Sequence, residues 1–235
     1  MITINNLHKS FGALKVLDGL EIMTIEKGIF AVLGPNGSGK TTLIKCILGM
    51  VIPDKGSIQI NHQEVAGEWE YREYISYMPQ IADFPPNLTI IELIEMIKTI
   101  RCNIINEQEL IDLFGLKSFL HKKFSTLSGG TKQKVNIILT FMSNSPLIIL
   151  DEPTTGLDPL ALITFKKLLL KEKEKGKTII ITSHIISLIE EISDEIVFIL
   201  DGKIFFNGSI STLKKKTKKN NLEHAIANII QNHND

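Results

Sequence analysis

The chain has 235 residues, of which 26 are Lys or Arg and 26 are Asp or Glu, so its formal net charge is zero. This length suits one large domain, or a core domain with a subdomain, and allows a substantial hydrophobic core. The charge balance gives no electrostatic reason to expect a nucleic-acid partner, and we predict none. The two cysteines, Cys46 and Cys102, are far apart and suggest neither a zinc site nor a disulfide framework, which fits a reducing cytoplasm.

The amino-terminal residues Met1–Leu7 alternate like a strand and lack the basic start and apolar core of a signal peptide. No uninterrupted apolar segment approaches the roughly 20 residues needed to cross a bilayer. We therefore expect any action on a membrane to go through a partner protein.

The first third of the chain is predicted to form short strands separated by turns. These strands are expected at Ile2–Leu7, Val16–Ile25, Ile29–Leu33, Ser57–Ile60 and Ile75–Met78. One glycine-rich loop and the helix that follows it interrupt the series.

That loop lies between the strand Ile29–Leu33 and a helix that starts near Leu43. Its glycines let successive N–H groups converge on a phosphate, and the helix N-terminus adds partial positive charge. Lys40 would neutralise the β- and γ-phosphates, and the Thr41 hydroxyl would complete the shell of a Mg²⁺ ion. Taken alone, the loop could also be a glycine-rich turn beside a solvated lysine. The predicted nucleotide-binding residues of the loop are Gly34, Pro35, Asn36, Gly37, Ser38, Gly39, Lys40, Thr41 and Thr42.

From about Leu88 the apolar residues take helical spacing, which predicts an inserted helical subdomain. Beyond it, strands alternate with helices, as in right-handed βαβ units that form a parallel sheet covered on both faces. A tight turn at Asp201-Gly202 predicts a hairpin. The expected helices are Thr89–Ile97, Glu107–Phe114, Ser128–Ser143, Leu160–Lys175 and one from Ile185, and the expected strands are Leu147–Leu150, Thr178–Thr182, Val197–Leu200 and Lys203–Phe206.

We therefore predict a single domain with three parts: a nucleotide-binding core at 1–84 and 145–213, a helical subdomain at 85–144, and a basic tail at 214–235. The tail begins with the lysine-rich run Lys214–Lys219 and continues with an amphipathic stretch, Leu222–Ile230. The run is either a solvated helix end or a segment attracted to anionic lipid.

Two further stretches have residue types suited to phosphate chemistry. The apolar run Leu147–Leu150 ends in Asp151 and Glu152, where one carboxylate can hold Mg²⁺ and the other can polarise the water that attacks a γ-phosphate. Ser128, followed by Gly129 and Gly130, is a suitable N-cap for a helix whose first N–H groups a phosphate can approach. On its own, this second stretch could be a capped helix with a flexible turn.

In this order and spacing, the motifs resemble those of the ATP-binding cassette ATPases, the motor subunits of ABC transporters. The resemblance extends from Ile2 to about Leu213. The stretches that match the family's motifs are Gly34–Thr41 at Walker A, Gln80 at the Q-loop, Ser128–Gly130 at the signature, Leu147–Asp151 at Walker B with Glu152 as the catalytic base, Gly156–Asp158 at the D-loop, His184 at the switch histidine, and Phe11 at the position of the aromatic ring that stacks on adenine.

The resemblance implies an α/β fold: a P-loop NTPase core with a mainly parallel sheet, an N-terminal antiparallel β subdomain and an inserted α-helical subdomain. It implies ATP and Mg²⁺ as cofactors, with Gln80, Thr41 and Asp151 at the metal. His184 would hold the γ-phosphate, and Asp158 would reach the site of a partner.

The resemblance also implies partners and a location. Two copies would pair head to tail, with each ATP between the Walker A residues of one copy and Ser128, Gly129 and Gly130 of the other. An integral membrane permease would be the second partner. The chain would then be cytoplasmic and peripheral on the cytoplasmic face of the inner membrane, with its permease docked at Ile81–Thr89.

Two residues depart from the family pattern. Thr131 takes a signature position that usually has glutamine, so we expect altered packing there with hydrolysis kept. Phe11 replaces the commoner tyrosine and keeps the ring. The sequences of three stretches are similar to those of the ATPase subunit that serves copper-site maturation of nitrous oxide reductase. These stretches are Leu127–Val135, Thr182–Ile185 and Asp194–Phe198.

Several alternatives stay open at this point. The chain could be the ATPase of an uncharacterised ABC exporter, or a soluble ABC-type ATPase without a permease, although it lacks the second cassette or coiled-coil insertion typical of the latter. A non-hydrolysing regulatory module is disfavoured by the presence of Glu152 and His184.

Overall fold

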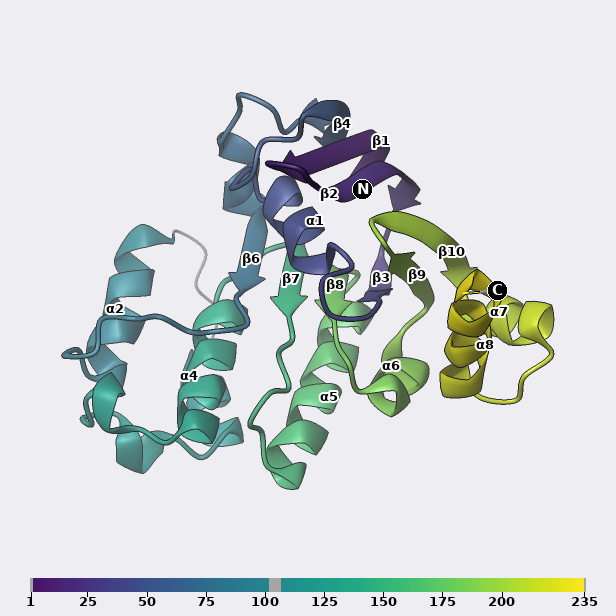
Figure 1. The fold of residues 1–235 in the computed structure, drawn as a ribbon. Coiled ribbons are helices and arrows are strands. Elements are labelled where there is room, and N and C mark those ends of the chain that lie inside the picture. Colours follow the sequence, from purple (N-terminus) through teal and green to yellow (C-terminus); the bar gives the residue numbers. More distant parts are fainter. Residues whose placement is uncertain (1, 102–106, 235) are drawn as a thin grey trace. The chain divides into compact units, whose positions relative to one another are not determined.

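The computed structural model describes residues 2–101 and 107–234. Cys102 lies outside these residues, and Cys46 is a buried free thiol. The chain divides into two compact units (Figure 1): a first unit of Met1–Arg72 with Thr178–Asp235, and a second unit of Glu73–Lys177. The subdomain boundaries that the sequence suggests stay a prediction.

The first unit begins with an antiparallel sheet in the order β2-β1-β4-β5. Its buried apolar residues lie on one covered face: Ile2, Ile4 and Leu7 are almost fully buried. The alternation is broken at Asn5 and Asn6, which are both exposed, where the pairing of β1 with β2 shifts register between Ile4 and Leu7. The predicted antiparallel N-terminal part is thus confirmed. The strands are β1 (Ile2–Phe11), β2 (Leu14–Ile25), β4 (Lys55–Ile60) and β5 (Gln63–Glu64).

A second set of strands in this unit runs in the order β10-β9-β3-β8. The strand β3 pairs in parallel with both β8 and β9. Every residue of β3 and β8 is buried, which explains why both read as unbroken apolar runs. The strands are β3 (Gly28–Leu33), β8 (Thr178–Thr182), β9 (Glu195–Leu200) and β10 (Lys203–Ser209).

The strands β9 and β10 form the predicted hairpin. Its two turn residues, Asp201 and Gly202, have φ of 47° and 72°. A positive φ at both positions is the type I′ pattern, whose twist matches that of the flanking strands. The helices of this unit are α1 (Lys40–Ile47), α6 (Ile186–Ile192), α7 (Ile210–Thr217) and α8 (Leu222–Asn234).

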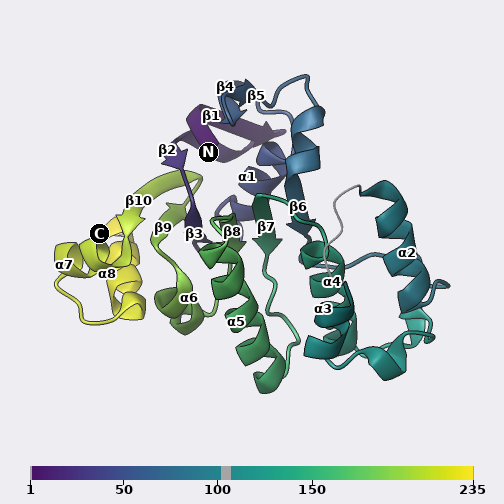
Figure 2. The ribbon, with the colours of Figure 1, turned by 180° about the vertical axis from the view of Figure 1, so that it is seen from behind.

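The helix α8 packs against α6 and α7, as Figure 2 shows from behind. Leu222 and Ala225 are fully buried, so the amphipathic stretch predicted in the tail packs its apolar face within the first unit. Lys214 forms an ion pair with Glu190 of α6, and Lys215 and Lys216 are exposed. This part of the tail therefore belongs to the folded unit.

The second unit pairs β6 in parallel with β7, and α4 contacts α2, α3 and β6. The rings of Phe141 and Phe165 meet edge to face at 6.1 Å, which joins α4 to α5. Thr89 and Glu92 form a capping box that starts α2. The elements are β6 (Ile75–Met78), α2 (Ile90–Ile100), α3 (Glu107–Leu113), α4 (Gly129–Phe141), β7 (Leu147–Asp151) and α5 (Pro159–Glu174), with 3-10 helices at Lys117–Phe119 and Phe124–Thr126; a further 3-10 helix, Glu70–Tyr74, contains the boundary between the units.

Parallel strands linked through helices confirm the predicted α/β class. Within residues 2–101 and 107–234, none of the helices combines the length and the hydropathy needed to cross a membrane.

Candidate active site

The phosphate-binding loop, defined here as residues 34–42, connects the buried strand β3 to α1. The N-cap of α1 is Gly39, which has φ of 106° and no side chain that could occupy the first N–H groups of the helix. Those N–H groups and the helix dipole favour an anion at this end. The loop therefore has the backbone geometry of an anion cradle.

Close backbone contacts explain two of the glycines in this loop. A Cβ added at Gly34 would lie 2.1 Å from the carbonyl oxygen of Ile199, and one at Gly39 would lie 2.8 Å from that of Val16. Gly37 has open space around it, but its φ of 81° favours glycine. The strands β9 and β2 thus press against the loop and restrict its sequence.

Two side chains of the loop fit a phosphate group. Ser38 is 3% exposed, and within the described residues its Oγ has no hydrogen-bond partner. The Lys40 Nζ donates to the carbonyl oxygens of Gly34 and Pro35, at 2.8 and 3.0 Å, so its ammonium is folded over the loop. A phosphate oxygen would accept from the Ser38 hydroxyl and attract the Lys40 ammonium. Thr41 and Thr42 follow in the first turn of α1, where both are half-buried.

Phe11 ends β1 and is 51% exposed, and the Lys9 Nζ lies 5.4 Å from the centre of its ring. An exposed ring at a strand end is available for stacking.

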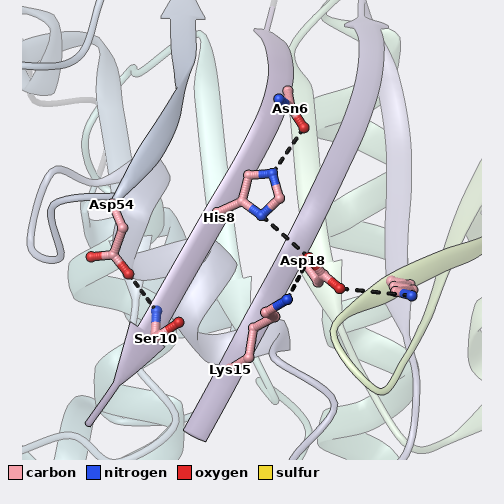
Figure 3. Close-up of polar contacts among 7 residues, drawn as sticks. Asn6, His8, Ser10, Lys15, Asp18 and Asp54 are labelled. Carbon is pink, nitrogen blue, oxygen red and sulfur yellow. Dashed lines mark hydrogen bonds and ion pairs between the residues drawn. The ribbon is translucent and has the colours of Figure 1, made fainter. Parts of the chain in front are cut away.

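Polar contacts hold the β1–β2 hairpin that carries Phe11, as Figure 3 shows. His8 bridges Asn6, at 2.9 Å, and Asp18, at 3.3 Å.

Asp54 ties the end of β1 to the start of β4. Its carboxylate accepts from the Ser10 N–H at 2.7 Å, as Figure 3 shows, and from the Lys9 Nζ at 2.8 Å. These two hydrogen bonds, first that of Lys9, lower the pKa of Asp54. The contact fixes the residue that precedes Phe11.

Replacing Asp54 by Asn is therefore expected to destabilise the protein in a pH-dependent way. Because the pKa of Asp54 is lower in the folded state, its contribution is fully present above the unfolded value of about 3.9 and is lost as the pH falls through the folded value. The gap in urea midpoint between wild type and Asp54→Asn should be largest near neutral pH and shrink in acid. The exposed Asp83→Asn is the matched control. A gap that stays constant with pH would contradict the assignment.

His184 lies between β8 and α6 in the first unit and is exposed. The Oγ of the buried neighbour Ser183 accepts from the Ile185 N–H at 3.0 Å, which shapes this turn. The imidazole thus follows the carboxyl end of a parallel strand, where α/β proteins commonly place functional groups.

In the second unit, Asp151 ends β7 and Glu152 follows it. They are 2% and 8% exposed, respectively, and Glu152 has φ of 50°, which is unusual for a residue with a side chain. Burial and the nearby Asp151 raise the pKa of Tyr77 to about 12, so this phenol stays protonated beside the carboxylate. The strand end therefore presents two carboxylates with little access to solvent.

Ser128 caps α4, as the sequence predicts. Its Oγ accepts from the Thr131 N–H at 3.3 Å and lies 2.8 Å from the Thr131 hydroxyl. Thr131 thus engages the capping serine directly. A Cβ at Gly130 would lie 2.7 Å from the carbonyl oxygen of Gly156, whereas nothing lies within 4 Å of one at Gly129.

Asp158 follows Gly156 and caps α5, accepting from the Ala161 N–H at 2.8 Å. Its second oxygen lies 2.7 Å from the Lys134 Nζ of α4. The hydrogen bond from Lys134, followed by that from Ala161, lowers the pKa of Asp158. Gln80 is exposed just beyond β6, after Pro79, whose carbonyl oxygen accepts from the Asn136 Nδ2 at 3.2 Å.

Comparison with known proteins decides the family. A family model described as "ABC transporter" matches residues 17–155, more than half of the chain. The chain belongs to the ABC transporter family. This confirms the resemblance seen in the sequence and the expectation that the chain is an ATP-binding ATPase with a P-loop α/β fold.

Individual ABC transporter proteins agree with this result. The chain is 33% identical over 237 residues to the lantibiotic transport ATP-binding protein SrtF of Streptococcus pyogenes, covering 98% of this chain and 97% of SrtF. It is 34% identical over 223 residues to the bacitracin transport ATP-binding protein BcrA of Bacillus licheniformis, covering 93% of this chain and 73% of BcrA. A solved structure described as the ATP-binding subunit of an ABC transporter superposes with a TM-score of 0.91 at 28% identity, covering 98% of this chain and 99% of that one.

The structure adds three side chains of α4 that sequence reasoning missed: Gln133, Lys134 and Asn136. Each contacts a loop that carries a predicted site residue. The available signal was the pair of carboxamides at Gln133 and Asn136, three residues apart on a helix with many buried residues. Its partners are distant in the sequence, so the pattern alone did not identify them.

Proposed function

We propose that this chain is the ATP-binding and hydrolysing subunit of an ABC transporter and couples ATP-driven closure of a dimer to transport by a separate membrane permease. The observation that carries the proposal is the phosphate-binding loop. Its buried Ser38 hydroxyl lacks a partner among the described residues, and its Lys40 ammonium lies over the loop carbonyls. Both groups suit the phosphates of a nucleotide.

Residues of the first unit bind ATP in this proposal. The exposed ring of Phe11 stacks on adenine, and the backbone of residues 34–42 surrounds the phosphates. Lys40 neutralises the β- and γ-phosphates, and His184 contacts the γ-phosphate. The open glycine backbone and the helix N-terminus at Gly39 support this assignment.

Hydrolysis uses further residues in this proposal. Thr41, Gln80 and Asp151 would hold Mg²⁺, which supplies charge stabilisation for the transferred phosphoryl group. Glu152 orients the attacking water and accepts its proton. The low exposure of Asp151 and Glu152 supports these roles, because charge interactions are stronger where water is scarce.

A second copy of the chain completes the site in this proposal. Ser128, Gly129 and Gly130 at the start of α4 approach the ATP bound by the partner, and Asp158 crosses the dimer interface. The exposed Ser128 and the open space at Gly129 leave this helix start accessible to a phosphate.

The same geometry suggests a test of the composite site. Gly129 has room for a side chain, so Gly129→Asp should fold and bind ATP at its own loop, yet repel the partner's phosphate and lose turnover. Lys40→Ala should also lose turnover, but because it no longer binds ATP at its own loop. Mixing the two inactive variants should restore activity, because a mixed dimer has one intact site. Phosphate release measures the result, with Ser125→Asp as the control. An inactive mixture, or full activity of Gly129→Asp alone, would count against the proposal.

A membrane permease is the second partner we propose, which places the chain at the cytoplasmic face of the inner membrane. We propose residues 81–89 as the docking segment. Ile81 is 78% exposed there, and Phe84 packs edge to face on Phe124 at 5.6 Å, which gives the segment a fixed anchor. Photocrosslinking from position 81 in membranes should capture an integral membrane protein. Crosslinks to soluble proteins alone would support the alternative without a permease.

We propose that the transporter served by this chain is an exporter. SrtF and BcrA are named for lantibiotic and bacitracin transport. This favours an exporter ATPase over copper-site maturation of nitrous oxide reductase, which remains the alternative. Identification of the membrane proteins that purify with the tagged chain would distinguish the two.

A further inference from the structure

The helix α4 has two carboxamides on its buried face. Gln133 is 6% exposed and Asn136 is 1% exposed, and the spacing of three residues puts them on the same side of the helix. Burying a carboxamide is costly unless its polar atoms are hydrogen-bonded. The partners of their hydrogen bonds therefore identify the segments that this face of α4 keeps in place.

Both carboxamides donate to carbonyl oxygens that follow paired strands. The Gln133 Nε2 donates to Pro153 at 2.8 Å, and the Asn136 Nδ2 donates to Pro79 at 3.2 Å. Pro79 follows β6, and Pro153 comes two residues after β7. These strands are parallel neighbours, with Met78 opposite Leu150. One rigid helix thus fixes the chain just beyond both strand ends.

The backbone of Glu152 needs such support. Its φ of 50° is in the left-handed region, which is unfavourable for a residue with a Cβ. The Thr155 N–H and hydroxyl donate to the Glu152 carbonyl oxygen at 3.4 and 3.2 Å. The next carbonyl, that of Pro153, is held by Gln133 in a buried hydrogen bond. Strained conformations persist only where surrounding contacts determine them.

We propose that Gln133 is a positioning residue for Glu152, holding the carbonyl of Pro153 so that the Glu152 carboxylate keeps the orientation that hydrolysis needs. Asn136 anchors the same helix face beyond β6 and keeps Gln133 in place. The inference rests on the proposed role of Glu152 as the catalytic base. Gln133 itself contacts neither nucleotide nor water in this scheme.

The first test is Gln133→Met, which keeps the length and volume of the side chain and removes the donor. We expect kcat for ATP to fall roughly ten- to hundredfold, since small misplacements of a catalytic group have effects of that size. The KM for ATP should stay within about twofold, because ATP binding does not involve the carboxylate. Gln108→Met on α3 is the matched control, since Gln108 is exposed and donates to Asp112 of its own helix. Gln133→Asn, whose shorter carboxamide does not reach Pro153, should show the same loss if the Met variant does not fold.

The second test separates positioning from general stability. If Gln133 acts through Glu152, adding Gln133→Met to a Glu152→Gln chain should leave its residual single-turnover rate unchanged. Losses that multiply in the double variant would overturn the inference, as would a wild-type kcat for Gln133→Met. Turnover retained by Glu152→Gln would instead overturn the proposed base. The two failures are therefore distinguishable.

Discussion

ATP turnover in the Glu152→Gln variant is expected to fall by at least about a hundredfold, the lower end of what a positioned general base contributes. Glutamine keeps the size of the side chain and its place after β7 but does not accept a proton from the attacking water. The proposed binding groups Lys40 and Phe11 are untouched, so ATP affinity should stay the same. With hydrolysis blocked, the ATP-bound dimer should accumulate.

Two measurements check this expectation. Phosphate release gives the turnover, and size-exclusion chromatography with and without ATP gives the oligomeric state. Glu174→Gln at the exposed end of α5 is the matched control and should behave as wild type. Lys40→Ala should differ from both, losing ATP binding and therefore the dimer. A Glu152→Gln profile that ATP leaves unchanged would count heavily against a dimer that closes on nucleotide.

Much of the fold could be predicted because its central strands are buried on both faces. Such strands read as unbroken apolar runs, and β3, β7 and β8 were found in the sequence for this reason. The turn at Asp201 and the cap at Ser128 also have local signals, since each depends on residues next to it in the chain. The ends of elements have weaker local signals: the amphipathic stretch predicted from the sequence ends at Ile230, whereas α8 extends to Asn234.

The order of the motifs predicts the site residues, but it does not predict their physical surroundings. The sequence does not show that the buried Ser38 hydroxyl lacks a partner among residues 2–101 and 107–234, or that Glu152 has a positive φ. Both follow from contacts between distant segments. The same is true of Lys134 and Asp158, which are 24 positions apart and meet only in the fold. The motif pattern therefore predicts the role of each residue, and the tertiary structure shows the contacts that hold it in place.

The substitution Gly34→Ala is expected to abolish nucleotide binding and to destabilise the first unit. Its Cβ would lie 2.1 Å from the Ile199 carbonyl oxygen and 2.6 Å from the Ser38 Oγ, at a φ of 152°. The Ile199 atom belongs to the backbone of β9 and cannot turn away as a side chain would. The loop must therefore move, at a cost of roughly 2–4 kcal/mol, which is typical of overpacking combined with backbone strain.

Gly37→Ala provides the internal comparison, because nothing lies within 4 Å of its Cβ and only the φ of 81° is unfavourable. That strain costs about 1 kcal/mol, so this variant should keep most of its ATP affinity. Binding of a fluorescent ATP analogue and thermal unfolding would measure both effects. If close approach of β9 shapes the loop, Gly34→Ala must be the more damaging change in both assays. Equal damage from the two variants would mean that backbone φ alone limits the loop, and that Ile199 has no part in forming the phosphate site.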